Sequence, residues 1–341
     1  MTDALTALKP FITKVSEKQI LSFDEACEAF EIVMSGGATS AQIAGFLVAL
    51  RMRGENVDEL SAAVKVVRAK ALPIKAPANA MDIVGTGGDG SGTLNISTAT
   101  AIVVAGCGVP VAKHGNRALS SKSGAADVLG TLGVNLDAPI EKIEQAIAEA
   151  GIGFMLAPRH HSSFKYVGSA RVELGIRTMF NILGPLCNPA GVKRYLLGVY
   201  SKDWVRPMAE VLAKLGCEKA WVVHGADGLD ELSTTGQNYV CEVNGSEIKE
   251  LSISPEDAGL PLATLEQLKG GEASYNAERL KALLNGQKDA YRDIVLFGAA
   301  AALLIAEKAS DLKEGARMAA ESIDSGNALH ALEEMINICQ N

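Results

Sequence analysis

In residues 1–73, hydrophobic residues do not alternate with polar ones as in a β-strand, and residues that typically begin helices precede the apolar segments. Side chains of Ser, Thr and Asn at these positions can accept a hydrogen bond from a backbone N–H in the first helical turn. Such signals begin three segments, at Ser22 with Glu25, at Thr39 with Gln42, and at Asn56. The sequence therefore predicts a helical N-terminal part, followed by a proline- and alanine-rich link over residues 72–80.

After the link, short apolar runs alternate with longer helical patterns. The predicted strands are 81–85, 109–115 (with a loop), 195–201 and 220–225, and the predicted helices are 97–108, 124–133 and 204–216. Alternation of this kind predicts an α/β domain. The less regular stretch 226–255 is compatible with antiparallel strands. The thirteen-residue apolar run 294–306 is too short to span a bilayer and is interpreted as a buried helix.

Composition narrows the class of protein. The chain has 341 residues, of which 48% are hydrophobic, and its formal net charge is −8. This charge argues against non-specific binding to nucleic acid or to acidic membranes. The six cysteines form no CxxC pair, and the N-terminus has no apolar signal core. We therefore expect a cytoplasmic protein with reduced cysteines.

The densest chemical signal is GTGGDGSGTLNIST, residues 85–98, which lies between a predicted strand and a predicted helix. Glycines at the carboxyl end of a strand expose successive backbone N–H groups to an anion, and a helix N-terminus adds its dipole. The hydroxyls of Thr93, Ser97 and Thr98 can also donate to phosphate oxygens. A flexible linker is the alternative, but a linker seldom joins a buried strand to a helix start. The run predicts a phosphate or pyrophosphate site.

A second loop, KHGNRALSSKSG at 113–124, also follows a predicted strand. Its cations and hydroxyls suit a multiply charged phosphate, although a solvated basic loop has the same composition. Two such loops in one domain suggest a ligand with two separated phosphates.

Adjacent carboxylates, Asp230 and Glu231, come directly after the strand predicted at 220–225. Beside phosphates, such a pair typically holds Mg²⁺. Alone, it is more often a helix N-terminus or plain surface, and the two loops are what favour the metal interpretation.

The stretch 171–189 predicts a short helix followed by a Gly-Pro turn. Arg171 and Arg177 are six residues apart and do not share a helix face, so one is a candidate for holding a substrate carboxylate while the other is structural. His160 and His161 have no evident partner in the sequence.

Together these stretches resemble the anthranilate phosphoribosyltransferase family, in order and in spacing and over essentially the whole chain. The matching residues are GTGGD (85–89), NIST (95–98), KHGNRALSSKSG (113–124), ADVLGTLG (126–133), LGIRTMFNILGPLCNP (174–189) and DGLDELS (227–233). The resemblance implies a small all-helical domain plus a larger α/β domain with a central, mostly parallel (mixed) sheet. The helical domain would contain residues 1–73 with about 169–188 inserted, and the α/β domain would contain 74–168 and 189–341.

The resemblance also implies a reaction: transfer of the phosphoribosyl group from phosphoribosyl pyrophosphate (PRPP) to anthranilate, in tryptophan biosynthesis. The partners implied are these two substrates, no nucleic acid, no membrane, a second copy in a homodimer joined through the helical domains, and a possible complex with anthranilate synthase components. Mg²⁺ is the implied cofactor, with two ions per subunit.

Site residues carry over position by position. The residues implied to bind PRPP are Gly85, Gly88, Asp89, Thr93, Asn95, Ile96, Ser97, Thr98, Lys113, His114, Gly115, Asn116, Arg117, Ala118, Leu119, Ser120, Ser121 and Ala125. Those implied for anthranilate are Gly85, His114, Asn116 and Arg171, and those for the metal are Ser97, Asp230 and Glu231. No residue is assigned as a catalytic acid or base, because an aromatic amine is already neutral at pH 7. Lys113 and Arg171 are expected to act by position and charge.

The sequence departs from the family pattern in three places. Ala125 stands where the family often has serine, which removes one hydroxyl. Gly130 replaces a usual glutamate. The segment SSFKYVGSAR, 162–171, differs from the usual pattern before the arginine.

Two alternatives stay open from the sequence. A pyrimidine nucleoside phosphorylase of the same fold would use inorganic phosphate and need only one phosphate site. A nucleic-acid-binding relative would need a basic groove and no carboxylate pair.

Overall fold

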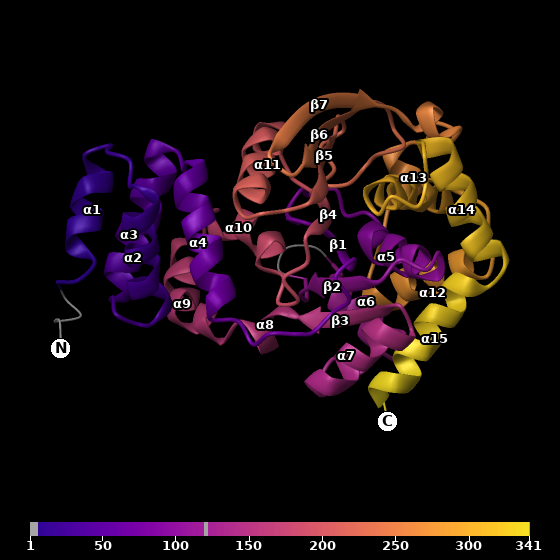
Figure 1. The fold of residues 1–341 in the computed structure, drawn as a ribbon, viewed down its shortest axis with the longest axis horizontal. Coiled ribbons are helices and arrows are strands. Elements are labelled where there is room, and N and C mark those ends of the chain that lie inside the picture. The colour runs from indigo at the N-terminus through magenta and orange to yellow at the C-terminus, as the bar shows by residue number, and fades with distance from the viewer. Residues whose placement is uncertain (1–5, 119–121, 341) are drawn as a thin grey trace.

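The computed structural model describes residues 6–118 and 122–340, which form a small helical domain beside a larger α/β domain (Figure 1). The helical domain contains α1 (Lys9–Ser16), α2 (Phe23–Met34), α3 (Ser40–Arg53) and α4 (Val57–Ala69). Three of these helices begin where the capping residues predict. Ser22, Thr39 and Asn56 each accept a bond from the backbone three residues ahead, and each is part of a reciprocal capping box.

A single mixed sheet of seven strands forms the centre of the α/β domain within the described residues. The strands are β1 (Met81–Gly85), β2 (Val111–Gly115), β3 (Ile152–Leu156), β4 (Arg194–Gly198), β5 (Lys219–Gly225), β6 (Asn238–Asn244) and β7 (Glu247–Ile253). Their order is β3-β2-β1-β4-β5-β6-β7. Pairing is parallel from β3 to β5 and antiparallel from β5 to β7. The mostly parallel sheet and the antiparallel pair beyond residue 225 are thus confirmed.

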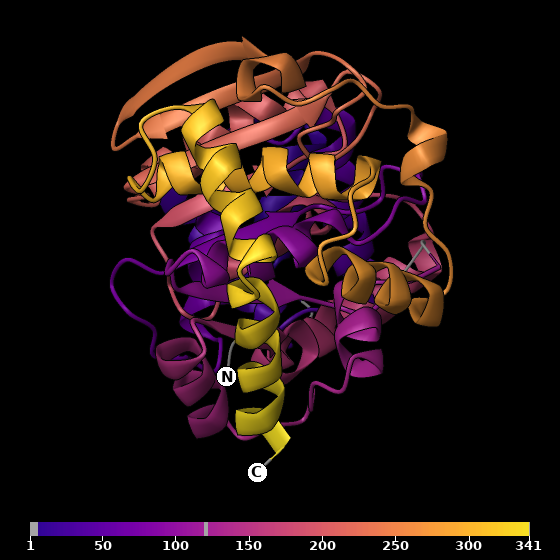
Figure 2. The same ribbon diagram turned by 90° about the vertical axis from the view of Figure 1, so that its right-hand side faces the viewer.

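Helices cover both faces of this sheet (Figures 1 and 2). The helices that follow the link in the chain are α5 (Ile96–Gly106), α6 (Ala125–Thr131), α7 (Ile140–Glu149), α8 (Ala157–His160), α9 (Lys165–Leu174), α10 (Phe180–Leu183), α11 (Val205–Lys214), α12 (Ala273–Leu284), α13 (Ala290–Ile305), α14 (Leu312–Asp324) and α15 (Asn327–Gln340), and α9 lies apart from the sheet, in the helical domain. The apolar run at 294–306 falls in α13, whose residues are almost all buried. Among the described residues, none of the helices has the length and apolar character needed to cross a membrane.

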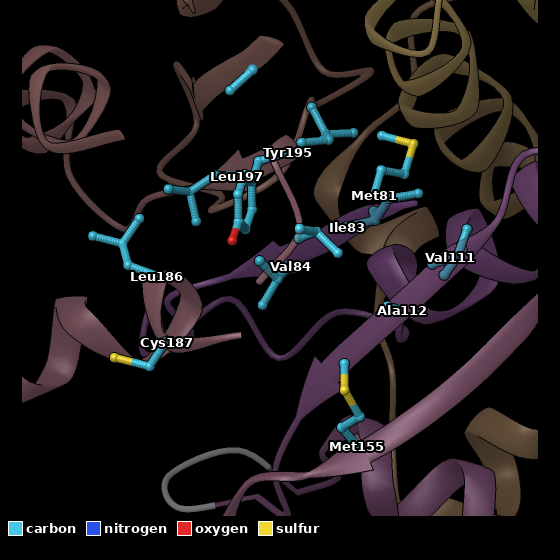
Figure 3. Packing of buried hydrophobic residues seen from close by; sticks show 14 of the residues in the cluster. Met81, Ile83, Val84, Val111, Ala112, Met155, Leu186, Cys187, Tyr195 and Leu197 are labelled. Carbon is cyan, nitrogen blue, oxygen red and sulfur yellow. The ribbon is translucent and has the colours of Figure 1, made fainter. Parts of the chain in front are cut away.

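The central strands are apolar because they are covered on both sides. Met81, Ile83, Val111 and Leu197 are at most 1% exposed and belong to one continuous hydrophobic core (Figure 3). Tyr195 is buried there too, and its hydroxyl accepts a hydrogen bond from Arg68 of α4 at 3.0 Å. The core therefore reaches the junction between the two domains.

Chain segments from beyond the link return to the helical domain. Helix α9 packs against α2 and α3, although it lies about a hundred residues later in the chain. The link itself has no helix or strand, and it is held at two points by backbone hydrogen bonds, from Leu72 to His160 and from Ile74 to Pro189.

One predicted element differs in detail. The sequence predicts a short helix and then a Gly-Pro turn within 171–189, and α10 with Gly184 and Pro185 after it fits this, but the end of α9, which runs from Lys165 to Leu174, occupies the start of the same stretch. Gly175 then adopts a left-handed conformation with φ 60°, and its amide bonds back to Arg171. Helicity resumes only at Phe180. Glycine therefore breaks the pattern that the apolar residues alone suggested.

Gly198 at the end of β4 is required by close packing, and this gives a stability prediction. A Cβ there would overlap the carbonyl oxygen of Asp230. Gly198→Ala should therefore lower the free energy of unfolding by about 2 kcal/mol, in the range of overpacked substitutions. Urea unfolding followed by circular dichroism measures this change.

The matched control is Gly45→Ala in α3, where an added Cβ would have no neighbour within 4 Å. Because glycine is a poor helix former, this control should stabilise the protein by about 0.5–1 kcal/mol. Equal effects of the two substitutions would contradict the packing argument.

Candidate active site

The predicted site residues gather at the carboxyl ends of the parallel strands, around a polar cavity of about 320 Å³. Loops after β1, β2 and β5 supply its walls. Of the residues expected to bind PRPP or metal, those lining it are Gly85, Gly88, Asp89, Thr93, Asn95, Ile96, Ser97, Lys113, His114, Gly115, Asn116, Arg117, Ala118, Ala125, Asp230 and Glu231. Thr98 is buried in the first turn of α5 and lines no part of the cavity. Leu119, Ser120 and Ser121 lie outside the described residues.

The glycine-rich run joins a buried strand to a buried helix, as the sequence predicts. Gly87, Gly88, Gly90 and Gly92 all have positive φ, a conformation that side chains oppose. The backbone is fixed at the start of the run, where Thr86 N–H donates to the carbonyl of Gly198 at 3.0 Å. These contacts describe a shaped loop rather than a flexible linker.

The second loop is fixed at both described ends by one carboxylate. Asp127, in the first turn of α6, accepts hydrogen bonds from the amides of Ala118 and Gly124, both at 2.9 Å, and pairs with Arg117. At the root of the loop, Lys113 is 2% exposed and its Nζ donates to the carbonyl of Ile83 at 2.6 Å. Burial lowers the pKa of Lys113, while Asp82 and Glu231 oppose that shift by their charge.

The acidic pair lies in a loop and not at a helix N-terminus. Glu231 accepts a bond from the amide of Ser97 at 3.0 Å, and Asp230 accepts one from the amide of Gly87 at 2.6 Å. Burial raises the pKa of Asp230 to about 6, helped by the charge of Asp89. Burial and the neighbouring Asp230 raise the pKa of Glu231 to about 8.

These adjacent, half-buried like charges fit a cation. Within the described residues, no group of three or more His, Cys, Asp and Glu side chains is arranged to hold a metal ion. An ion at the acidic pair would therefore complete its coordination with hydroxyl, water and ligand phosphate oxygens. That ligand set is typical of Mg²⁺, which keeps several waters. The residues present thus fit the predicted metal.

A second cavity, of about 670 Å³, adjoins the first and shares with it Val84, Gly85, Thr86, His114, Gly115, Asn116 and Asn181. Aromatic rings form one wall: His161, Phe164 and Phe180 contact one another edge to face in series. Arg171 also lines it, with its guanidinium 5.5 Å from the centre of the Phe180 ring. Among the described residues Arg171 forms no ion pair. The cavity therefore offers an apolar slot beside an uncompensated guanidinium.

Two histidines at the junction are neutral. His114 and His161 are 5.1 Å apart between ring centres, and both line the second cavity. Burial lowers the pKa of both, that of His161 to about 4. His160 instead bonds the carbonyl of Leu72 through Nδ1 at 2.9 Å. His161 is thus a cavity residue that sequence reasoning considered and left out.

Other lining or supporting residues were also missed. Phe164 lies in the segment that departs from the family pattern, and no periodicity pointed to it. Asp127 stands three residues after Gly124, a spacing typical of a capping carboxylate, and that signal was available. Arg177, left as a possible structural residue, lines the polar cavity.

Comparison with known proteins gives consistent similarities. Residues 9–71 match "Glycosyl transferase family, helical bundle domain", and residues 77–329 match "Glycosyl transferase family, a/b domain". A protein of Rhodospirillum rubrum named anthranilate phosphoribosyltransferase is 59% identical over 331 residues, which are 97% of this chain and 95% of that protein.

Solved structures are similar over their full length. Anthranilate phosphoribosyltransferase from Thermus thermophilus has a TM-score of 0.92 and 43% identity, covering 100% of both chains. The enzyme of the same name from Saccharomyces cerevisiae, in complex with PRPP and Mg, has a TM-score of 0.90 and 31% identity, covering 99% of both chains.

The raised pKa of Glu231 predicts a pH dependence of stability in the presence of EDTA. The pKa of Glu231 is raised in the folded state from 4.5 to about 8. The folded state then retains a proton that the unfolded chain releases, so the free energy of unfolding should fall as the pH rises from about 5 to about 8. Glu231→Gln cannot titrate, and its loss over this window should be smaller.

Urea unfolding at a series of pH values measures the difference. Glu333→Gln, an exposed position on α15, is the matched control and should follow the parent protein. A Glu231→Gln profile that parallels the parent across the window would contradict the burial argument.

Proposed function

The chain belongs to the anthranilate phosphoribosyltransferase family, and on this basis we propose that it transfers a 5-phosphoribosyl group from PRPP to the amine of anthranilate. The products are N-(5-phosphoribosyl)anthranilate and pyrophosphate. One observation carries the proposal: a polar cavity with phosphate-binding features meets an apolar cavity with an unpaired arginine, and the two share Gly85, His114 and Asn116. The geometry suits a phosphorylated donor and an aromatic acid that react where the cavities join.

The donor side is assigned to the polar cavity. The glycine run and the start of α5, Gly85–Thr98, would hold pyrophosphate and ribose, with Thr98 supporting from behind. The loop from Lys113 to Ser121, together with Ala125, would close on the remaining phosphate. Backbone amides and cations suit this ligand because it carries several negative charges.

The acidic pair is assigned to Mg²⁺, held by Ser97, Asp230 and Glu231, with two ions per subunit. Bound there, the metal would supply positive charge that stabilises the pyrophosphate leaving group. The two carboxylates are anchored through the amides of Gly87 and Ser97, so the same contacts that shape the glycine run also aim the ligands.

The acceptor side is assigned to the apolar cavity, with Gly85, His114 and Asn116 at its inner end. Arg171 would hold the anthranilate carboxylate, because a guanidinium binds a carboxylate through two parallel hydrogen bonds. Its desolvated surroundings, which lower its own pKa, strengthen that attraction. The aromatic wall would pack against the ring of the substrate.

The chemistry then needs positioning more than acid or base catalysis. The C1–O bond to pyrophosphate breaks, and a bond forms between C1 and the amine nitrogen, through a transition state that resembles an oxocarbenium ion. The amine is neutral at pH 7, and after the bond forms its nitrogen releases one proton to the departing pyrophosphate or to water, so no strong base is needed. Lys113 would act by its charge near the leaving group, while the closed cavity excludes water.

The alternatives are less consistent with the site. A nucleoside phosphorylase needs one phosphate site, whereas two loops line the polar cavity. A nucleic-acid binder needs no acidic pair, and in this chain Asp230 and Glu231 line the site. The relatives named above favour the transferase over both.

Further assignments rest on the same family membership. We propose residues 1–73 with about 169–188 as one domain, 74–168 and 189–341 as the other, and the link at 72–80 as a hinge between them.

We also propose a homodimer through the helical domain, where Met52 on α3 and Val172 on α9 are 81% and 82% exposed. A role in tryptophan biosynthesis, a cytoplasmic location, and association with anthranilate synthase components complete the proposal.

The direct test uses the fluorescence of anthranilate. Purified chain, PRPP and Mg²⁺ should cause anthranilate fluorescence to decay, and EDTA should stop the decay. A flat trace from folded protein would contradict the proposed acceptor. Thymidine with inorganic phosphate would then test the phosphorylase.

Arg171→Ala should separate the two substrates. Loss of a charge-assisted contact to the carboxylate should raise the KM for anthranilate by a factor of about 10–100, with a much smaller change in the KM for PRPP. Arg317→Ala, an exposed arginine of α14, is the matched control. Equal losses for both substrates would mean that Arg171 is structural.

A further inference from the structure

The glycine run is anchored at its two ends by its own domain. At the start, Gly87 bonds Asp230. At the far end, Leu94 N–H donates to Leu268 at 2.9 Å, Gly270 N–H donates to Gly92 at 2.9 Å, and Lys269 Nζ donates to the carbonyl of Ser91 at 2.9 Å. The apex between these anchors, Gly88–Gly90, takes part in none of them.

One side chain reaches this apex from outside the run. Among the described residues, the hydrogen bond that Gly88–Gly90 receives from elsewhere in the chain comes from Arg177, whose Nη2 donates to the carbonyl of Gly88. The Asp89 carboxylate bonds only within the run, to Ser91. Arg177 therefore contacts the part of the glycine run that the anchors within the α/β domain do not hold.

Arg177 is itself supported from both domains. It lies between α9 and α10, and its carbonyl accepts a hydrogen bond from Arg51 of α3. Its guanidinium lies 4.3 Å from the centre of the Tyr200 ring, just beyond β4. The amide of Tyr200 donates to Thr86 Oγ1 at 3.1 Å, so the platform under the guanidinium is tied to the start of the glycine run.

We propose that Arg177 is a positioning residue that fixes the apex of the glycine run from the helical domain. Glycine loses more backbone freedom on ordering than any other residue, and the apex contains two glycines with positive φ, Gly88 and Gly90. Ordering this segment before the ligand arrives lowers the entropic cost of binding pyrophosphate. This inference rests on the proposed function only in taking PRPP as the substrate that brings the pyrophosphate group.

The geometry also explains why arginine serves here. A planar guanidinium can lie on an aromatic ring and donate in its own plane at the same time, which an ammonium group cannot do. The hydrogen bond from Arg51 links this contact to α3 of the helical domain. A shift of α3 would therefore move Arg177 and, with it, the apex of the glycine run. The donor loop thereby depends on the domain that contributes Arg171.

Hydrogen–deuterium exchange of the free protein tests the positioning without any substrate. Arg177→Ala should speed amide exchange in peptides that cover residues 86–92. Arg177→Lys should also speed amide exchange in these peptides, because an ammonium group has the charge but cannot stack on Tyr200 and donate to Gly88 as the planar guanidinium does. Arg51→Ala should give a smaller increase at the same peptides. Arg317→Ala, exposed on α14, should match the parent.

Binding gives the second measurement. The Kd of magnesium pyrophosphate, measured by calorimetry, should rise about tenfold in Arg177→Ala and in Arg177→Lys, the ratio expected for one charge-assisted hydrogen bond. In turnover, the KM for PRPP should rise while kcat changes less. A residue needed only for folding would instead lower the melting temperature without a selective change at these peptides.

The outcomes separate cleanly. Amide exchange and pyrophosphate affinity that are unchanged in Arg177→Ala would overturn the inference. Parent-like values in Arg177→Lys would overturn it too, because they would show that positive charge alone is sufficient. A parent-like Arg51→Ala would overturn the interdomain part. If the parent protein fails to consume anthranilate, the proposed function is wrong. Amide exchange and pyrophosphate affinity still test the positioning role of Arg177, because neither measurement uses anthranilate.

Discussion

Two adjacent carboxylates, half-buried at the carboxyl edge of the sheet, are the constraint on which the rest of the site depends. Asp230 and Glu231 each accept a backbone amide from the glycine run or from the start of α5. Gly198 and Gly85 have no side chain, and this absence makes room for the loop that carries the pair. Burying like charges together is unfavourable, as their raised pKa values show. Such an arrangement is stable in a protein that binds a cation there.

The two cavities divide the chemistry by polarity. Backbone amides, Lys113 and the carboxylates line the polar one, and aromatic rings with Arg171 line the other. The imidazoles of His114 and His161 are neutral where the cavities meet, because burial lowers their pKa. The positive charges of Lys113 and Arg171 therefore lie in different cavities.

Local signals predicted much of the fold. The capping residues at Ser22, Thr39 and Asn56 mark true helix starts, because capping depends on neighbours three residues apart. The strand at 81–85 was predicted with its true bounds. β3 and α7, in contrast, carried no recognised signal. The short helix predicted within 171–189 is α10, directly before the Gly-Pro turn, but the apolar pattern does not encode the left-handed Gly175 that ends α9 in the same stretch.

The sequence by itself determined which residue types surround the ligand: a glycine run, a basic loop and an acidic pair, each following a strand. Those features are local, and parallel strands bring their carboxyl ends to one edge. Only the tertiary structure decided which distant groups meet there. Arg177 reaches Gly88 from the segment after α9, a helix that packs on α2 and α3. His161 contacts His114 because it follows β3, which pairs with β2. Contacts across such separations depend on how domains pack, and no short stretch of sequence specifies them.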